Sequence, residues 1–579
     1  MLCLPTRRGA PSRPGLSLGL LVTLAGCAGA PTVPTPPPAA SAPSTPPEED
    51  IAAARQAGKK LGFTWDEYGP AAFARAQREG KLVLLDCVAT WCHWCHVMDD
   101  TTYTDPELGR LLRDKVVAVR VDIDSRPDLA SRYEDYGWPA TVLLSAGGEE
   151  LGKFRGYLAP EVLRQRVEQA LQRGAAPGSG AQAAPARRGL ITPPVPVGML
   201  GWIGAQATQL LDDYYDRDEG GWGKRQKMPL GANVEFELVR ARHGDDAARE
   251  RARFTLEKQR ALIDPVWGGV YQYSVNGVWT EPHFEKRLPL QTAAIEAAAR
   301  ALTELPAPAD RASARADGER VAGYVLSFLR NRDGLFLVSQ DADLGGHDKE
   351  RGFVDGHVYY AKDDAGRRAL GIPRIDDHVY AFENGLAIAA LSALAAALHG
   401  EPQAALYQKA AEQAADAILR SHVEPDGTVK REAIATSSLR FLADGAALAL
   451  ALARLGQQAG AMAGAIRYRE AAERITATLW RTLYAPSSGL LWVSTNDPGA
   501  AGVFARREQP FAANVLVARA LAALSRAAGV PEPSRRLYRQ RALGLLAALA
   551  TPERLSAQGR ILGEYLLALD EAGALRWAR

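Results

Sequence analysis

The stretch Lys81-Leu-Val-Leu-Leu-Asp-Cys-Val-Ala-Thr-Trp-Cys-His-Trp-Cys-His-Val-Met98 decides the fold of the first domain. Residues 81–89 form an apolar run with the length and flanks of a buried parallel strand. This run leads directly to Cys92 and Cys95, where a helix is expected to begin. The sequence therefore predicts a cysteine pair at the junction of a buried strand and a helix.

The residues after this junction complete an α/β pattern. Apolar runs predict buried strands and a short edge strand, and a helix follows from Pro160; the predicted strands are 116–122, 140–144 and 153–157. This β-α-β-α-β-β-α order resembles the thioredoxin fold. Asp86 and Trp91 also match that family in their spacing to the first cysteine, and Pro139 stands where the family places its cis-proline.

The position of the cysteine pair predicts thiol-disulfide chemistry. Because a helix N-terminus favours an anion, Cys92 is expected to be the thiolate that attacks a partner disulfide, and Cys95 is expected to resolve the mixed disulfide. Asp86 would take and return the Cys95 proton; alternatively, it is a buried polar group satisfied by a neighbour. His93 and His96 would lower the pKa of Cys92, or are simply exposed polar residues. The backbone at Pro139 would offer hydrogen bonds to a substrate chain.

Two other interpretations of the cysteine pair are disfavoured. His96 completes the Cys-x-x-Cys-His signature of c-type haem, but haem needs an exposed attachment loop and a cavity, and here a buried strand runs into the motif. Cys92, Cys95, His93 and His96 are also a poor zinc set, because adjacent positions on one helical turn cannot all converge on a tetrahedral ion. We therefore expect no metal and no cofactor other than a redox-active Cys92–Cys95 disulfide.

The cysteine count points to a partner in trans. The chain has five cysteines, and none follows Cys95. Cys3 lies in the predicted signal, and Cys27 is a predicted lipid site. Sulfurs that exchange with Cys92 and Cys95 therefore belong to Cys87 or to another molecule, and we expect a cysteine-containing protein client or redox partner.

The N-terminus predicts export and a lipid anchor. Arginines precede an apolar run at 16–24 that is too short to span a bilayer, and Leu24-Ala-Gly-Cys27 resembles a bacterial lipobox. The resemblance implies cleavage before Cys27 and lipidation of its sulfur; ordinary signal cleavage at 28–30 is the alternative. Residues 31–47 are rich in Pro, Ala, Ser and Thr, which is typical of a stiff tether. We expect a membrane-anchored, periplasm-facing lipoprotein that touches the membrane through its anchor alone.

Composition and linkers divide the rest of the chain. With 47% hydrophobic residues, 23% charged residues and a net charge of +2, the sequence gives no reason to expect a nucleic-acid partner. A second Pro/Gly/Ala-rich segment separates two domains. The predicted organisation is a signal peptide at 1–26, a tether at 27–50, a thioredoxin-like domain at 51–172, a linker at 173–198 and a helical domain at 199–579.

The helical domain repeats long Ala/Leu-rich stretches joined by glycine-aromatic connections. Twelve helices are predicted, in six pairs: 200–214, 232–243, 245–263, 290–304, 310–331, 384–398, 402–421, 440–457, 463–483, 511–528, 534–549 and 557–572. Such an arrangement resembles the (α/α)6 toroid of six-hairpin glycosidases and sugar epimerases. An open solenoid of helical pairs is the structural alternative.

Several longer motifs are similar to one specific family. Residues 91–98, 121–128 and 136–139 resemble the spermatogenesis-associated thioredoxin-like family, whose bacterial members join this domain to a large helical glycosidase-like domain. Residues 282–286, 341–343 and 384–386 match motifs of that second domain, although Arg287 stands where the family pattern leads us to expect methionine. The predicted lipoprotein signal is a departure from the usual members.

The connections of the helical domain hold a candidate sugar pocket. Aromatic side chains beside carboxylates suit stacking on sugar rings and acid/base chemistry on hydroxyls. The candidate residues are Trp279, His283, Glu285, Asp341, Asp343, His378 and Asn384. The alternative is structural, since buried carboxylates also cap helices and brace loops.

Three functional hypotheses follow. The first is an exported, lipid-anchored thiol-disulfide oxidoreductase with an appended carbohydrate-binding or carbohydrate-processing toroid. In the second, the toroid is catalytically silent and acts as a receptor for a glycan or partner of the redox module. The third is a sugar hydrolase or epimerase with a vestigial thioredoxin domain. This third hypothesis is disfavoured because the sequence keeps Asp86, Trp91, both cysteines and Pro139.

Overall fold

The computed structural model describes residues 61–174, 194–346, 352–434, 437–458 and 463–577. The predicted signal peptide, Cys27, the tether and most of the predicted linker lie outside these ranges. None of the helices within them combines the length and apolar character needed to cross a bilayer.

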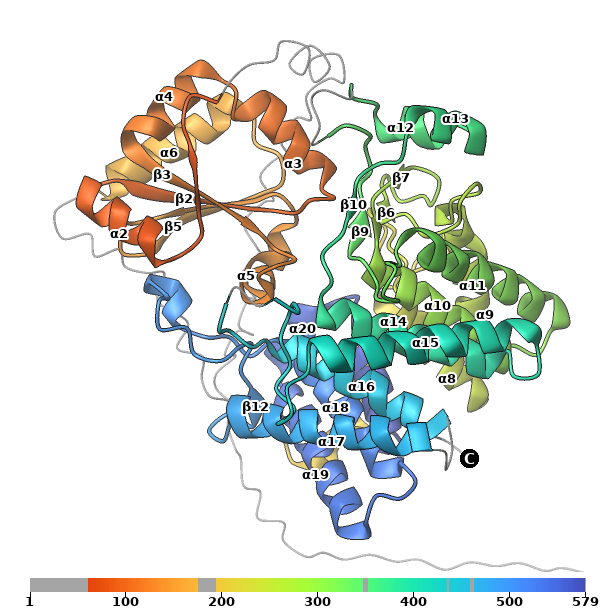
Figure 1. The fold of residues 1–579 in the computed structure, drawn as a ribbon. Helices are drawn as coiled ribbons and strands as arrows, with labels where there is room; N and C mark the ends of the chain where they lie inside the picture. The colour runs from red at the N-terminus through yellow and green to blue at the C-terminus, as the bar shows by residue number, and fades with distance from the viewer. Residues whose placement is uncertain (1–60, 175–193, 347–351, 435–436, 459–462, 578–579) are drawn as a thin grey trace, which may run out of the picture. The chain divides into compact units, whose positions relative to one another are not determined.

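The first domain is built on a five-stranded mixed sheet (Figure 1). Strand β2 (Leu82–Val88) lies at its centre, parallel to β3 (Val116–Asp122) and antiparallel to β4 (Ala140–Leu144). The edge strands are β1 (Trp65–Glu67), parallel to β3, and β5 (Glu150–Arg155), antiparallel to β4. The predicted thioredoxin-like class is confirmed, although the three residues of β1 carry no pattern that predicts a strand.

Helices cover both faces of this sheet because alternate residues of a strand point to opposite sides. Val83 and Leu85 of β2 pack in one core with α2 (Pro70–Glu79) and α5 (Pro127–Tyr133). Leu84 packs in a second core with α4 (Pro106–Lys115) and α6 (Pro160–Gly174). A central strand buried on both faces is rigid, and β2 is the strand that delivers the cysteines.

The second domain is a closed ring of helices. Six inner helices each pack on the next, and the last packs on the first: α8 (Gly231–Arg242), α10 (Leu288–Glu304), α14 (Ala381–Ala397), α16 (Leu442–Gln458), α18 (Phe511–Arg526) and α21 (Gly563–Glu571). Five outer helices each pack on the inner helix that precedes them: α9 (Asp246–Gln259), α11 (Pro308–Phe328), α15 (Pro402–Ser421), α17 (Ala463–Leu483) and α19 (Glu532–Leu549).

The sixth outer helix closes the ring. Helix α7 (Leu200–Asp213), the first of the domain, packs on α21, the last. The twelve helices in the described part of the chain thus form an (α/α)6 toroid, and the open-solenoid alternative is wrong. The predicted helix at 557–572 is two helices, α20 (Pro552–Gln558) and α21, because Gly559 between them has a φ of 52°.

Besides α20, the connections of the toroid contain short sheets and the short helices α12 (Gly356–Tyr360) and α13 (Asp364–Leu370). Strands β8 (Lys286–Arg287), β9 (Ser339–Gln340) and β10 (Ile375–Asp376) form one sheet, which brings three loops side by side. The other sheets are β6 (Tyr273–Ser274) with β7 (Pro282–His283) and β11 (Tyr484–Ala485) with β12 (Leu490–Leu491). The β8–β9–β10 sheet places the residues after β9, including Asp341 and Asp343, next to those before β8.

Two loops of the toroid repeat one arrangement of buried charge. Asp216 accepts a hydrogen bond from Lys227 Nζ at 2.7 Å, and Asp264 accepts one from Lys286 Nζ at 2.6 Å. Each lysine also donates to a glycine carbonyl of the same loop. The guanidinium of Arg367 also donates two hydrogen bonds to the Asp264 carboxylate, at 2.6 Å to Oδ2 and 3.1 Å to Oδ1. The side chains of Asp264, Lys286 and Arg367 are fully buried, so each charge depends on the others.

Two inner helices of the ring share a second feature, an asparagine amide that bonds to both the backbone N–H and the backbone C=O of one residue. Asn384 accepts a hydrogen bond from Phe336 N at 2.8 Å and donates to Phe336 O at 3.0 Å. Asn514 makes the same two bonds, at 2.8 and 3.0 Å, with Leu491. These amides tie the start of α14 and of α18 to the loop that precedes each helix.

Replacing Asn384 by alanine is expected to lower the free energy of unfolding by about 1–3 kcal/mol, because the buried backbone N–H and C=O of Phe336 lose their partner. Chemical denaturation of the full chain measures this loss. Gln408→Ala is the matched control, since that amide donates to Glu412 one turn away on the same helix. It should change stability by less than about 0.5 kcal/mol. Equal losses in the two variants would contradict a structural role for Asn384.

Candidate functional site

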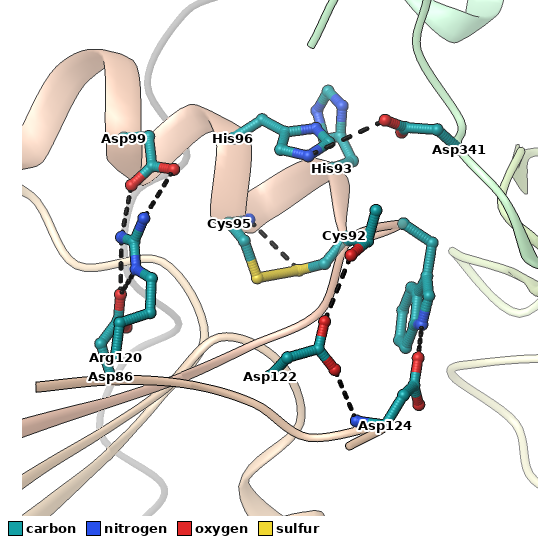
Figure 2. Close-up of a disulfide and its surroundings, with 12 residues drawn as sticks. Asp86, Cys92, His93, Cys95, His96, Asp99, Arg120, Asp122, Asp124 and Asp341 are labelled. Carbon is teal, nitrogen blue, oxygen red and sulfur yellow. Dashed lines mark hydrogen bonds and ion pairs between the residues drawn. A yellow bond between two sulfur atoms is a disulfide. The ribbon is translucent and has the colours of Figure 1, made fainter. Parts of the chain in front are cut away.

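The cysteine pair lies where β2 gives way to α3 (His93–Val97) (Figure 2). Cys92 is the N-cap residue of α3, and Cys95 N donates a hydrogen bond to Cys92 Sγ at 3.2 Å. The two cysteines form a disulfide and are almost fully buried. The Trp138–Pro139 peptide is cis, and Pro139 is the residue next to the Cys87–Ala140 pair of β2 and β4. The backbone at Pro139 therefore lies beside the strand end that carries the disulfide.

Asp86 is held in a buried charge cluster. Arg120, its neighbour on β3, donates to Asp86 Oδ2 at 2.8 and 3.2 Å and also bridges to Asp99. Burial raises the pKa of Asp86, and the Arg120 charge opposes that shift. Asp86 Oδ1 has no hydrogen-bond partner among the described residues. This arrangement fits both earlier interpretations, because one oxygen is satisfied by a neighbour while the other is able to accept a proton.

The histidines of the motif face the toroid. His93 Nδ1 lies 2.6 Å from Asp343 Oδ2, and His96 Nε2 lies 3.8 Å from Asp341 Oδ2. Burial lowers the pKa of His93, but Asp343 outweighs it and raises the pKa to about 9. Burial likewise lowers the pKa of His96, and the Asp341 and Asp343 carboxylates more than reverse this shift. His96 is 2% exposed, so it is not the exposed polar residue of the alternative interpretation.

Three residues that sequence reasoning missed hold the loop before the cysteines. Trp91 Nε1 donates to Asp124 Oδ2 at 2.7 Å, and the Arg287 guanidinium lies 4.2 Å from the centre of the Trp91 ring. Arg431 donates to the Asp124 backbone carbonyl at 2.8 Å. Cations of the toroid thus brace the indole before Cys92. The sequence signals were the 121–128 motif, which contains Asp124, and the departure at Arg287, which stands at the position where methionine is expected.

The structure separates the candidate pocket residues of the toroid into two groups. Trp279 and Asn384 are buried in the fold: Trp279 Nε1 donates to Glu219 O at 2.8 Å, and Asn384 brackets Phe336. His378 pairs with Asp376 at 2.5 Å and stacks on Tyr380. These residues make local contacts within the toroid.

The other candidates gather around the two histidines of α3. Besides Asp341 and Asp343, this group contains Glu285, which is 3% exposed and whose pKa burial raises to about 7. The charges of His93 and Asp343 act on Glu285. His283 stacks on Tyr273, and burial lowers its pKa to about 4. The predicted sugar pocket and the predicted redox motif thus share one cluster of side chains.

Cys87 is excluded as an exchange partner by its position. Its thiol is free, fully buried in the sheet, and burial raises its pKa well above the ordinary value. We expect that, after mild reduction of the native protein, iodoacetamide modifies Cys92 while Cys87 stays unmodified until denaturant is added. Mass spectrometry of peptides measures this order. Modification of Cys87 and Cys92 at equal rates in the native protein would contradict it.

Comparisons with known proteins found matches to parts of this chain. Residues 55–170 match the family model "Thioredox_DsbH: Protein of unknown function, DUF255". Spermatogenesis-associated protein 20 of Mus musculus is 27% identical over 325 residues, which cover 48% of this chain and 38% of that protein. The Homo sapiens protein is 28% identical over 315 residues, covering 48% and 39%. The chain thus spans about two fifths of the length of these relatives.

Solved structures of sugar-modifying enzymes also match. Cellobiose 2-epimerase from Spirochaeta thermophila is 14% identical with a TM-score of 0.47, covering 65% of this chain and 96% of that one. A D-mannose isomerase is 13% identical with a TM-score of 0.44, covering 60% and 84%. The assignment of the helix ring is based on the helix–helix contacts described above. Residues 55–170 thus match a thioredoxin-like domain family, part of the chain is similar to spermatogenesis-associated protein 20, and the helices that follow form an (α/α)6 toroid.

Proposed function

We propose that this protein is a thiol-disulfide oxidoreductase whose active pair is Cys92 and Cys95. The observation that carries the proposal is the Cys92–Cys95 disulfide at the N-terminus of α3, directly after the central strand β2. Unpaired backbone N–H groups at this position stabilise a thiolate on Cys92. The cis Pro139 beside it supplies backbone for an extended client chain.

The exchange proceeds in two balanced steps. The Cys92 thiolate attacks one sulfur of a client disulfide, which forms a mixed disulfide and releases a client thiolate that takes up a proton. Cys95 then loses its proton to Asp86 and attacks Cys92 Sγ, which releases the second client sulfur as a thiolate, and Asp86 returns the proton to that sulfur. The client disulfide gains two electrons and two protons, and Cys92 and Cys95 end as a disulfide. The same steps in reverse oxidise a client dithiol.

We also propose export and a lipid anchor at Cys27, supported by the lipobox-like Leu24-Ala-Gly-Cys27 and the proline-rich tether. The toroid would then present the redox domain to its client or to a glycan. One observation favours a catalytically silent toroid over a sugar hydrolase or epimerase. Asp341 and Asp343, which a sugar reaction would use, are engaged by His96 and His93 of the redox motif.

Titration of the full chain against glutathione redox buffers tests the oxidoreductase proposal. The fraction of Cys92–Cys95 disulfide, measured by alkylation and mass spectrometry, should follow one two-electron transition. The potential of that transition also separates a reductant from an oxidant. Absence of any transition between fully reducing and fully oxidising buffer would remove the basis of the proposal. Cys95→Ser is the control and should show no internal disulfide in any buffer.

A further inference from the structure

Four side chains from two distant parts of the sequence meet beside the disulfide. His93 and His96 lie one turn apart on α3, and Asp341 and Asp343 follow β9 of the toroid. Within the triplet His96, Asp341 and Asp343, one nitrogen or oxygen of each residue lies within 4.8 Å of the others, and His93 Nδ1 lies 2.6 Å from Asp343 Oδ2. Figure 2 shows both imidazole rings on the side of α3 that faces Asp341, opposite Asp99.

Both carboxylates are held in place by the backbone. Asp343 Oδ1 accepts a hydrogen bond from Gly356 N at 2.9 Å, which leaves Oδ2 facing His93. Asp341 Oδ1 accepts one from Asp343 N at 3.2 Å, which leaves Oδ2 facing His96. Each carboxylate thus has one oxygen fixed by a peptide N–H and the other directed at an imidazole. Fixed outer contacts of this kind orient the ligands of metal sites.

A buried carboxyl group beside the four residues is a second, independent observation. Glu285 is 3% exposed, and its Oε2 has no hydrogen-bond partner in the described part of the chain. The charges of His93, Asp343 and Asp341 act on it. A buried carboxyl oxygen without a protein partner usually has a water or an ion as its partner. The cluster therefore contains a carboxylate oxygen, Glu285 Oε2, that is not used in a hydrogen bond within the described part of the protein.

We propose that His93, His96, Asp341 and Asp343 form a binding site for a divalent transition metal of the Zn²⁺ class. Two imidazoles with two carboxylates suit zinc and its first-row neighbours, whereas Ca²⁺ and Mg²⁺ prefer oxygen ligands alone. With both imidazoles neutral, as ligation requires, the two aspartates supply two negative charges, which a divalent ion balances.

The site differs from the zinc set that the sequence disfavours. That set required both cysteines and both histidines of one helical turn to converge on one ion. Here α3 supplies only the two residues at positions i and i+3, which share a face, and the toroid supplies the rest. The 2.6 Å His93–Asp343 distance must widen to about 3.3 Å to fit two ligands of a tetrahedral zinc. Metal binding would have to be accompanied by rotation of the His93 side chain, which also brings its ring toward His96 and Asp341.

Asp355 is close to His93 and Asp343 but is not assigned as a ligand. Its Oδ1 accepts a hydrogen bond from His357 N at 2.8 Å and caps α12. A metal on the other four residues would link the redox helix to the loop after β9. It would thereby fix the position of α3 without using a sulfur ligand.

Calorimetric titration of Zn²⁺ into the full chain tests the site. The protein is first stripped of metal with a chelator and kept oxidised, so that no thiolate competes for the ion. We expect one strong site per chain, and we expect Asp343→Asn and Asp341→Asn each to weaken zinc binding by at least about ten-fold. Asp99→Asn is the matched control, because Asp99 pairs with Arg120 on the other side of α3. It should change affinity by less than two-fold.

X-ray absorption at the zinc edge of the wild-type protein gives a measurement that needs no variant. The expected spectrum shows a nitrogen/oxygen shell with imidazole scattering and no sulfur. The proposal is overturned if the oxidised protein binds no zinc, if both aspartate variants bind it like the wild type, or if sulfur appears in the shell. Should an aspartate variant lose its circular-dichroism signature of folding, the absorption spectrum decides. Neither measurement depends on the oxidoreductase activity.

Discussion

The Cys92→Ser variant is expected to lose disulfide reduction completely, because a serine hydroxyl cannot form the mixed disulfide that begins the exchange. Cys95→Ser is expected to behave differently: Cys92 still attacks, but the mixed disulfide with the client has no resolving thiol and accumulates. Reduction of insulin disulfides measures the first effect. Mass spectrometry of the trapped adduct measures the second.

Cys87→Ala is the matched control for these variants. The Cys87 thiol is fully buried and makes no disulfide, so its removal should leave the rate of insulin reduction within about two-fold of wild type. If Cys92→Ser retained the wild-type rate, or if the trapped adduct formed through Cys87, the assignment of Cys92 as nucleophile would be wrong.

The largest loss of stability is expected for Asp264→Asn. The asparagine leaves Lys286 and Arg367 buried without a counter-charge, and removing one member of a buried ion cluster typically costs about 3–5 kcal/mol. Burial disfavours the charged form of Lys286 even in the wild type and lowers its pKa to about 8 although Asp264 opposes the shift. Urea unfolding followed by tryptophan fluorescence measures the loss.

The exposed ion pair of Asp246 with Arg249 provides the comparison for this variant. Asp246→Asn removes the same charge from a surface pair and should change the free energy of unfolding by less than about 1 kcal/mol. A loss below about 1 kcal/mol in Asp264→Asn as well would mean that the two cations find water or new partners after the substitution.

Much of the fold was predictable from periodicity. The twelve helical stretches follow runs of Ala and Leu broken by glycine-aromatic connections, and the structure has twelve ring helices at closely similar positions. One apolar run predicts the strand β2 and the position of Cys92 and Cys95 just after its end. Strand β1 could not be predicted, because Trp65-Asp-Glu67 is too short for an alternating pattern.

The site was predictable only in its local part. The spacing of Asp86, Cys92 and Cys95 is a property of one strand and one helix, which a sequence pattern can express. The contact of His93 with Asp343 joins residues 250 positions apart, and no local pattern carries such information. Nor could composition show which way a loop side chain points: Trp279 sits beside carboxylates in the sequence, yet it is buried with its indole N–H bonded to the backbone.

The pairing of α7 with α21 has a consequence for how the chain matures on the ribosome. The sheet and flanking helices of the first domain are complete in sequence by residue 174, whereas the ring cannot close before residues 563–571 have been made. Until then, the sides of α7, α8 and α18 that pack on α21 stay uncovered. A growing chain therefore contains the whole cysteine-bearing sheet while the apolar surfaces of its second domain still need protection from aggregation.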